Sequence, residues 1–330
     1  MMHVRSPNRK KEETEYAYII RGGIIMEKMR FEQFAEEVVN KIREFLPESF
    51  ANASVELQSV VKNNDLKLTG LTIRSANSNI SPTIYLEQFY DEYQSGKDMG
   101  RILSNIADVR IRNEVKEAFD VAQITDFEQV KDHIAPRLMN REWNEELLKA
   151  RPNKSIADLA VAYHIMLKQD INGTASVPVT NALMESWGVD ADALHELAIK
   201  NLPVLLPSTF QSMSSVLFGL MEDSEEEKDM FAGMPSQDEV MFILSNEQKM
   251  HGAAALLDES IMQKVTEKFG EFYILPSSIH ECIIVKANAD MDVNTLTSMV
   301  QDVNAEQVAL EERLSDHVYR YTADTGLISA

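Results

Sequence analysis

The chain has 330 residues, of which 44% are hydrophobic and 26% are charged, which is enough for one large globular domain or two ordinary ones. Its formal net charge of −21 disfavours nucleic acid and anionic membranes as partners, because both repel an acidic surface and the body of the sequence contains no basic patch. The single cysteine, Cys282, excludes an internal disulfide and a cysteine-based metal site, and it suits a reducing cytoplasm.

The first 25 residues differ in composition from the rest of the chain. They begin with basic residues, show no helical or strand period, and contain no apolar signal-peptide core. Two explanations remain open. Arg21-Gly22-Gly23 lies just before Met26 and is what a translated ribosome-binding site would encode, so the start would be misassigned; alternatively, residues 1–25 are a disordered leader.

Residues 26–150 predict an N-terminal helix–hairpin–helix region. Apolar residues at helical spacing predict a helix over 31–46, which Pro47 ends. Alternating residues predict strands at 55–61 and 66–73 around a polar turn, with a third strand at 83–86. A short helix follows, then a longer one from Asp98 to about Phe119 and another from Thr125 past Ile134. The polar stretch 144–153 predicts the domain boundary.

Residues 151–330 predict a mixed-sheet α+β domain. Strands are expected at 156–167, 175–179, 240–244, 272–275, 281–285 and 318–321, with Asn172-Gly173 as a hairpin turn. The first of these strands has an alternative, because residues 158–162 would also suit a helix. Thr180, either Asp190 or Asp192, and Asp292 are expected to cap helices, Pro203 and Pro207 to break the chain, and Gly252 to precede one helix over 253–269. The acidic run 222–227 is typical of a solvated loop.

The turn between the strands at 272–275 and 281–285 carries the strongest candidates for chemistry. They are Ser277, Ser278, His280, Glu281 and Cys282. Strand alternation places His280, Cys282 and Ile284 on one face. One hypothesis is therefore a nucleophile, Ser278 or Cys282, with His280 as its base. However, the chain has no Gly-x-Ser-x-Gly elbow, serines after proline are ordinary turn residues, and a lone cysteine inside an apolar strand is usually a buried hydrophobe.

Motifs for cofactors and metals are absent from the sequence. Neither GxGxxG nor GxxxxGK[ST] occurs, HExxH is missing, and the other histidines are dispersed. We therefore expect no cofactor and no metal.

Several segments resemble a family of uncharacterised bacterial proteins that is common in anaerobic Gram-positive bacteria. These segments are DLAVAYHIM (158–166), GAAALL (252–257), YILPSSIHE (273–281), MVQDVN (299–304) and LSDHVYRY (314–321). The resemblance covers about residues 27–322. It implies an intracellular bacterial protein and supplies no activity, cofactor or catalytic residue.

These observations together predict an α+β protein whose function is to bind a partner and not to catalyse a reaction. We expect a non-enzymatic binding or protein-interaction protein of the cytoplasm, with another protein or a second copy of itself as partner and with any small-molecule ligand undefined. The expected partners include neither nucleic acid nor membrane. The alternative is a hydrolase that uses Ser278 or Cys282 with His280.

Overall fold

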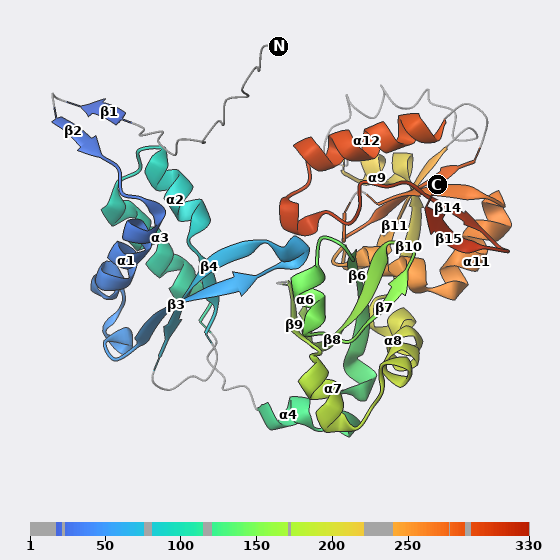
Figure 1. Cartoon of the computed structure of the whole chain (residues 1–330), viewed down its shortest axis with the longest axis horizontal. Coiled ribbons are helices and arrows are strands. Elements are labelled where there is room, and N and C mark those ends of the chain that lie inside the picture. Colours follow the sequence, from blue (N-terminus) through green and yellow to red (C-terminus); the bar gives the residue numbers. More distant parts are fainter. Residues whose placement is uncertain are drawn as a thin grey trace, which may run out of the picture. The chain divides into compact units, whose positions relative to one another are not determined.

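The chain folds into two compact units of mixed helix and sheet (Figure 1). This computed structural model describes residues 18–21, 24–75, 81–114, 121–170, 173–220, 240–276, 278–287 and 292–329. Unit 1 contains residues 1–60 and 67–119, and unit 2 contains residues 61–66 and 120–330. The boundary expected at residues 144–153 lies inside unit 2.

The described residues of unit 1 form the α-helices α1, α2 and α3 and a sheet of order β3-β4-β5. Its elements are β1 (Tyr18–Arg21), β2 (Ile24–Glu27), α1 (Phe31–Lys41), η1 (Ile42–Phe45), η2 (Glu48–Phe50), β3 (Ser54–Val61), β4 (Lys67–Arg74), β5 (Thr83–Tyr85), α2 (Glu87–Gln94) and α3 (Met99–Arg112). The expected helix over 31–46 is α1 extended by η1, and α3 ends at Arg112, before the predicted Phe119.

The described residues of the predicted disordered leader belong to strand β1 and to the start of β2. β1 pairs antiparallel with β2, and residues 1–17 and 22–23 lie outside the described residues.

Unit 2 contains a four-stranded sheet and a six-stranded sheet with helices around them. Its strands are β6 (Ile134–Asn140), β7 (Asn153–Ile156), β8 (Leu159–Asp170), β9 (Gly173–Pro178), β10 (Ser208–Ser212), β11 (Met241–Asn246), β12 (Phe272–Leu275), β13 (Cys282–Lys286), β14 (Tyr319–Thr322) and β15 (Gly326–Ser329). Its helices include the short 3-10 helix η3 (Asn63–Asp65), which lies in the stretch 61–66. The other helices are α4 (Val121–Thr125), α5 (Phe127–Val130), η4 (Lys131–His133), α6 (Glu145–Lys149), α7 (Asn181–Trp187), α8 (Ala191–Leu205), α9 (Met213–Leu220), η5 (Gly252–Leu257), α11 (Glu259–Phe269), α12 (Val293–Glu306) and η6 (Leu310–Glu312).

The six-stranded sheet has the order β10-β11-β13-β12-β14-β15, and every neighbouring pair in it is antiparallel. In the smaller sheet, β8 pairs antiparallel with β6, β7 and β9. The prediction of a mixed sheet is therefore wrong. The physical reason is that a short loop reverses the chain between β12 and β13, and β11 and β14, which pair with the outer edges of these two strands, are again antiparallel to their neighbours.

Strand alternation buries both faces of the six-stranded sheet. Cys282 and Ile284 of β13 point into the main core, where Leu138 and Val161 of the smaller sheet also lie. Val285 points to the other face, which α12 covers with Leu296 and Val300. The expected alternation in 281–285 is thus confirmed.

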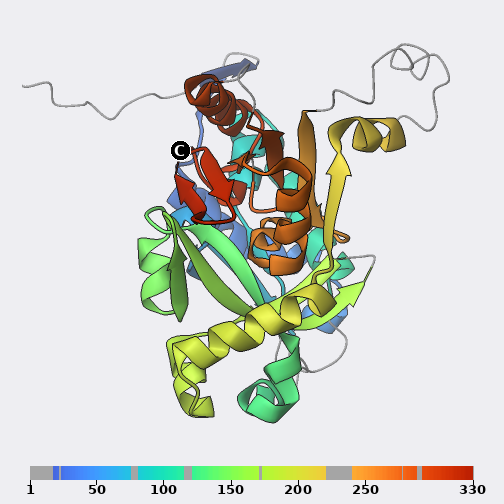
Figure 2. The ribbon, with the colours of Figure 1, turned by 90° about the vertical axis from the view of Figure 1, so that its right-hand side faces the viewer.

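Helix α8 packs against strands β6 and β8 of the smaller sheet (Figure 2). Its residues Leu194 and Ala198 belong to the main core. Pro203 lies inside α8, so the predicted break there is wrong; the helix ends at Leu205, two residues before Pro207.

Two further helix predictions are wrong. The helix expected from Thr125 past Ile134 ends in η4, and Ile134 begins strand β6. β6 tolerates Pro136 because it lies at an edge of its sheet, where a missing N–H is harmless. The helix expected over 253–269 is divided, because the side chain of Asp258 accepts the backbone N–H of Ser260 and begins α11 anew after η5.

Three other predicted features fall partly or wholly outside the described residues. They are the acidic run 222–227, Asn172 of the hairpin turn, and Ser277. Among the helices in the described ranges, none has the length and apolar character needed to cross a membrane.

Candidate functional site

The predicted candidate residues lie in the loop between β12 and β13 and at the start of β13. The hydroxyl oxygen of Ser278 accepts the backbone N–H of His280 at 3.0 Å. This is the local turn that serine forms with a residue two positions on. Glu281 precedes β13 and is half-buried, and its carbonyl accepts the backbone N–H of Ser278 at 3.4 Å.

His280 has contacts at both ring nitrogens. Its Nδ1 accepts the backbone N–H of His251 at 3.1 Å, so the ring proton of the neutral imidazole is on Nε2. Nε2 lies 3.5 Å from a carboxylate oxygen of Glu312. A general base needs a free lone pair to accept the proton of a nucleophile, and the lone pair of Nδ1 is already occupied.

The backbone of His280 also holds the loop in place. Its carbonyl oxygen accepts the hydroxyl of Ser245, which follows the apolar part of β11, at 2.8 Å. The rings of His251 and His280 lie 5.4 Å apart, centroid to centroid. In the described structure, His280 thus joins β11, the start of η5 and the β12–β13 loop.

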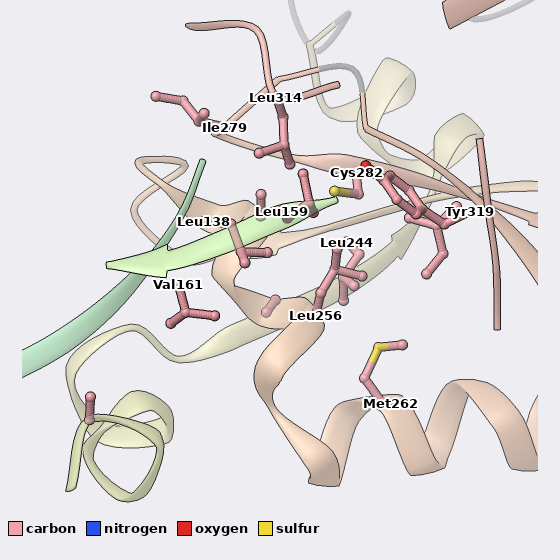
Figure 3. Packing of buried hydrophobic residues seen from close by; sticks show 14 of the residues in the cluster. Leu138, Leu159, Val161, Leu244, Leu256, Met262, Ile279, Cys282, Leu314 and Tyr319 are labelled. Carbon is pink, nitrogen blue, oxygen red and sulfur yellow. The ribbon is translucent and has the colours of Figure 1, made fainter. Parts of the chain in front are cut away.

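Cys282 lies fully within the main core. Figure 3 shows its sulfur among Leu159, Leu244 and Tyr319, and its exposed fraction is 0%. Burial raises the pKa of this thiol far above its usual range, and the charge of Glu281 raises it further. A thiol held protonated in an apolar core is a poor nucleophile.

The fold assembles a carboxylate–imidazole pair that sequence spacing did not reveal. Asp158, in the turn before β8, contacts Nδ1 of His317 through one carboxylate oxygen at 2.7 Å. Its other oxygen accepts the hydroxyl of the buried Tyr319 at 2.6 Å. His317 is exposed, so the arrangement fixes an imidazole at the surface with its Nε2 turned away from the carboxylate contact.

A second set of polar residues lies on one face of the smaller sheet. In the register of β6 and β8, Arg137 lies opposite Ala162 and Ala135 lies opposite His164, so Arg137 and His164 share a face. Arg137 donates to the hydroxyl of Ser176 on β9 at 2.6 Å. We call Arg137, Arg151, His164 and His251 the basic cluster.

The charges of the basic cluster act on one another. Burial, and to a smaller extent the nearby charge of Arg151, lower the pKa of Arg137 to about 10. Burial, followed by Arg137 and Arg151, holds the pKa of His164 well below its usual range. Burial and then Arg137 and His280 lower the pKa of His251 to about 3. At neutral pH the two histidines are therefore uncharged beside two charged arginines.

The sequence analysis noted His164 and His251 only as dispersed histidines and did not consider Arg137. Arg137 was missed because its segment was interpreted as the continuation of a helix. No period-two alternation marks this segment, because every position except the half-buried Arg137 is buried, and a short apolar run of this kind does not distinguish a strand from a helix.

Among the described residues there is no group of three or more His, Cys, Asp or Glu side chains that could hold a metal ion. The basic cluster has the opposite character, because its members are hydrogen-bond donors and cations.

Neither the comparison with curated proteins nor the comparison with solved structures returns a match. A family model described as a family of unknown function, DUF5688, matches residues 31–323. That range includes every segment on which the expected family resemblance rests, and it spans both units. The chain therefore belongs to this family of unknown function.

Proposed function

We propose that this protein is a non-enzymatic binding or interaction protein of the bacterial cytoplasm. The observation that supports the proposal is the contact of His280 at both ring nitrogens, which leaves the imidazole without a free lone pair beside Ser278. The burial of Cys282 supports it further, because the thiol has no exposed surface for a substrate. The β12–β13 loop, which carries His280, therefore has a structural role: it holds β11 and the start of η5 together.

The proposed partner is another protein, a second copy of this chain or a small molecule, and not nucleic acid or a membrane. The net charge of −21 supports this choice of partners. We also propose that the N-terminal region acts as a helix–hairpin–helix module within the binding protein.

The alternative is a hydrolase that uses Ser278 or Cys282 with His280. For this the His280 ring would have to leave both His251 and Glu312, and no observation among the described residues favours such a movement. A different acid–base role is compatible with the exposed His317, which Asp158 orients. Mutation of each histidine separates the two enzymatic alternatives.

The test combines native mass spectrometry with hydrolysis assays. The full chain, purified from a bacterial host, is expected to carry a second protein, a second copy or a small molecule. The same preparation is expected not to hydrolyse p-nitrophenyl esters or thioesters above the background rate.

Four variants serve as controls for residual hydrolysis: Ser278→Ala, Cys282→Ala, His280→Gln and His317→Gln. Ester hydrolysis that disappears in Ser278→Ala or Cys282→Ala and also in His280→Gln would overturn the binding proposal in favour of the alternative. Hydrolysis lost only in His317→Gln would overturn it in favour of the Asp158–His317 pair. A thiol reagent offers an independent check, since Cys282 is expected to react only after denaturation.

A further inference from the structure

The basic cluster lies between two apolar patches on the same face of the smaller sheet. At one end Ala135 and Met166 pack against Ala254 of η5, and at the other end Met139 and Ala160 pack together. Arg137 and His164 lie between these ends on β6 and β8. The position of η5 over Ala135 brings the preceding residue, His251, to the same place.

Arg151, the fourth member of the basic cluster, lies in the segment before β7. It lies two residues before Asn153, which is paired with Ala162 of β8, and Ala162 is itself paired with Arg137 of β6. Four basic side chains therefore lie close together although they are far apart in the sequence. They come from β6, from β8, from the segment before β7 and from the residue before η5.

The cluster includes a buried polar atom without a partner. His164 is only 5% exposed, and its Nδ1 forms no hydrogen bond. A buried nitrogen of this kind normally has a partner, because leaving it unpaired is unfavourable. Arg137, Arg151 and His251 are partly exposed, so a small solute can approach the cluster from solvent.

Among the described residues, the positive charge of the cluster also has no carboxylate partner. In the described part of the chain, neither Arg137 nor Arg151 forms an ion pair with a carboxylate, and the neighbouring charges that act on Arg137, His164 and His251 are all basic. Grouping like charges in a mostly buried position is unfavourable unless an opposite charge joins them. In a chain with 53 acidic residues, the lack of a carboxylate partner for these arginines among the described residues needs an explanation.

We infer that the basic cluster is a binding site for a small oxyanion, a phosphate or carboxylate group, held by Arg137, Arg151 and His164. Two guanidinium groups match the planar and tetrahedral oxygen arrangements of carboxylate and phosphate. The neutral imidazole of His164 supplies one N–H donor at the buried end, and His251 borders the site from η5. The inference rests on the proposed function, because it specifies the ligand that the binding protein takes.

The experiment measures the binding of inorganic phosphate and of succinate to the full chain at pH 7.5. Isothermal titration and thermal unfolding are recorded with sodium chloride at matched ionic strength, so that general screening is subtracted. One of the two anions is expected to bind and to raise Tm by a few degrees. Binding by phosphate or by succinate alone identifies the chemical group, and binding by neither overturns the inference.

Arg137→Met and Arg151→Gln are the test variants, with Arg101→Met on the exposed surface of α3 as the matched control. Each test variant is expected to weaken the binding of the anion about tenfold or more, whereas Arg101→Met leaves it unchanged. Arg137→Met is also expected to retain or raise Tm without anion, because it removes an unpaired buried charge. If Arg137→Met does not fold, Arg151→Gln alone decides the outcome.

A purely structural role for Arg137 predicts the reverse result: a lower Tm without anion and an unchanged response to phosphate or succinate. That result overturns the inference. It leaves the proposed function intact if native mass spectrometry still finds a partner. Hydrolysis assigned to Ser278, Cys282 or His317 overturns the proposed function instead, independently of anion binding.

Discussion

His251 and His164 are basic side chains that burial keeps uncharged. Burial, together with the charges of Arg137 and His280, lowers the pKa of His251 from 6.5 to about 3. The pKa of His164 is lowered in the same direction by burial, Arg137 and Arg151. Both side chains are therefore neutral in the folded protein at pH values where they are protonated in the unfolded chain.

This difference predicts that acid weakens the fold before carboxylates titrate. Between pH 6.5 and pH 5 the unfolded chain binds protons at both histidines and the folded protein does not, so the free energy of unfolding falls as pH falls. Each histidine contributes at most about 1.4 kcal/mol per pH unit. Urea unfolding at several pH values in this window measures the slope.

The variant His251→Gln is expected to reduce that slope, because it removes one of the two groups. His133→Gln, at an exposed position in η4, is the matched control and should leave the slope as it is in the unchanged protein. Equal slopes for the His251 variant and the unchanged protein would contradict the buried, neutral state of His251.

At the scale of elements, η5 is fixed to β11 and to the β12–β13 loop through Gly252. A Cβ at this position would lie 2.2 Å from the hydroxyl of Ser245, 2.4 Å from the carbonyl oxygen of His280 and 2.8 Å from the backbone nitrogen of Asn246. Two of these atoms belong to the backbone and cannot move aside without breaking the junction. The preceding His251 adopts a left-handed conformation, φ 53°, which brings the chain into this close approach.

Gly252→Ala is therefore expected to destabilise the protein by about 3 kcal/mol, since overpacking against backbone forces the junction apart. Gly188→Ala is the matched control. Gly188 ends α7 with φ 68° and has nothing within 4 Å of an added Cβ, so only the left-handed backbone penalty of about 1 kcal/mol applies. Denaturant unfolding compares the two, and equal losses would contradict the close approach at Gly252.

At the scale of the whole molecule, the two units have separate apolar cores. In unit 1, α1 and α3 pack against β4 through residues such as Phe34, Leu103 and Leu71. The core of unit 2 is built from both of its sheets and includes Leu244. In unit 1 the guanidinium of Arg110 is buried 4.6 Å above the ring of Phe50 and donates to the carbonyl of Ile73.

The separate cores predict that cavity mutations act within their own unit. Leu103→Ala and Leu244→Ala each remove a fully buried side chain and are each expected to cost about 3 kcal/mol. Hydrogen exchange measured by mass spectrometry should show lost amide protection in unit 1 for the first variant and in unit 2 for the second. Equal loss of protection across both units in either variant would contradict this expectation.

Local patterns in the sequence were sufficient for many elements. The alternation in 281–285 correctly assigned Cys282 and Ile284 to one face, and Thr180, Asp190 and Asp292 cap helices as predicted, each accepting a backbone N–H. These signals depend on residues within a few positions of one another, so the sequence carries them directly. Helix ends at Asp258 and Ile134 were missed because apolar side chains continued the pattern across them.

The sequence by itself determined the strongly acidic composition, the absence of common cofactor motifs, the mixed helix and sheet, and the family resemblance. Only the tertiary structure decided the state of the candidate residues, because His251 and Glu312 reach His280 from distant segments. It also formed the basic cluster, which has no counterpart in sequence spacing. Side chains on four separate segments meet there because strand pairing joins β6 to β8 and η5 packs beside them, and such pairings are set by the whole fold.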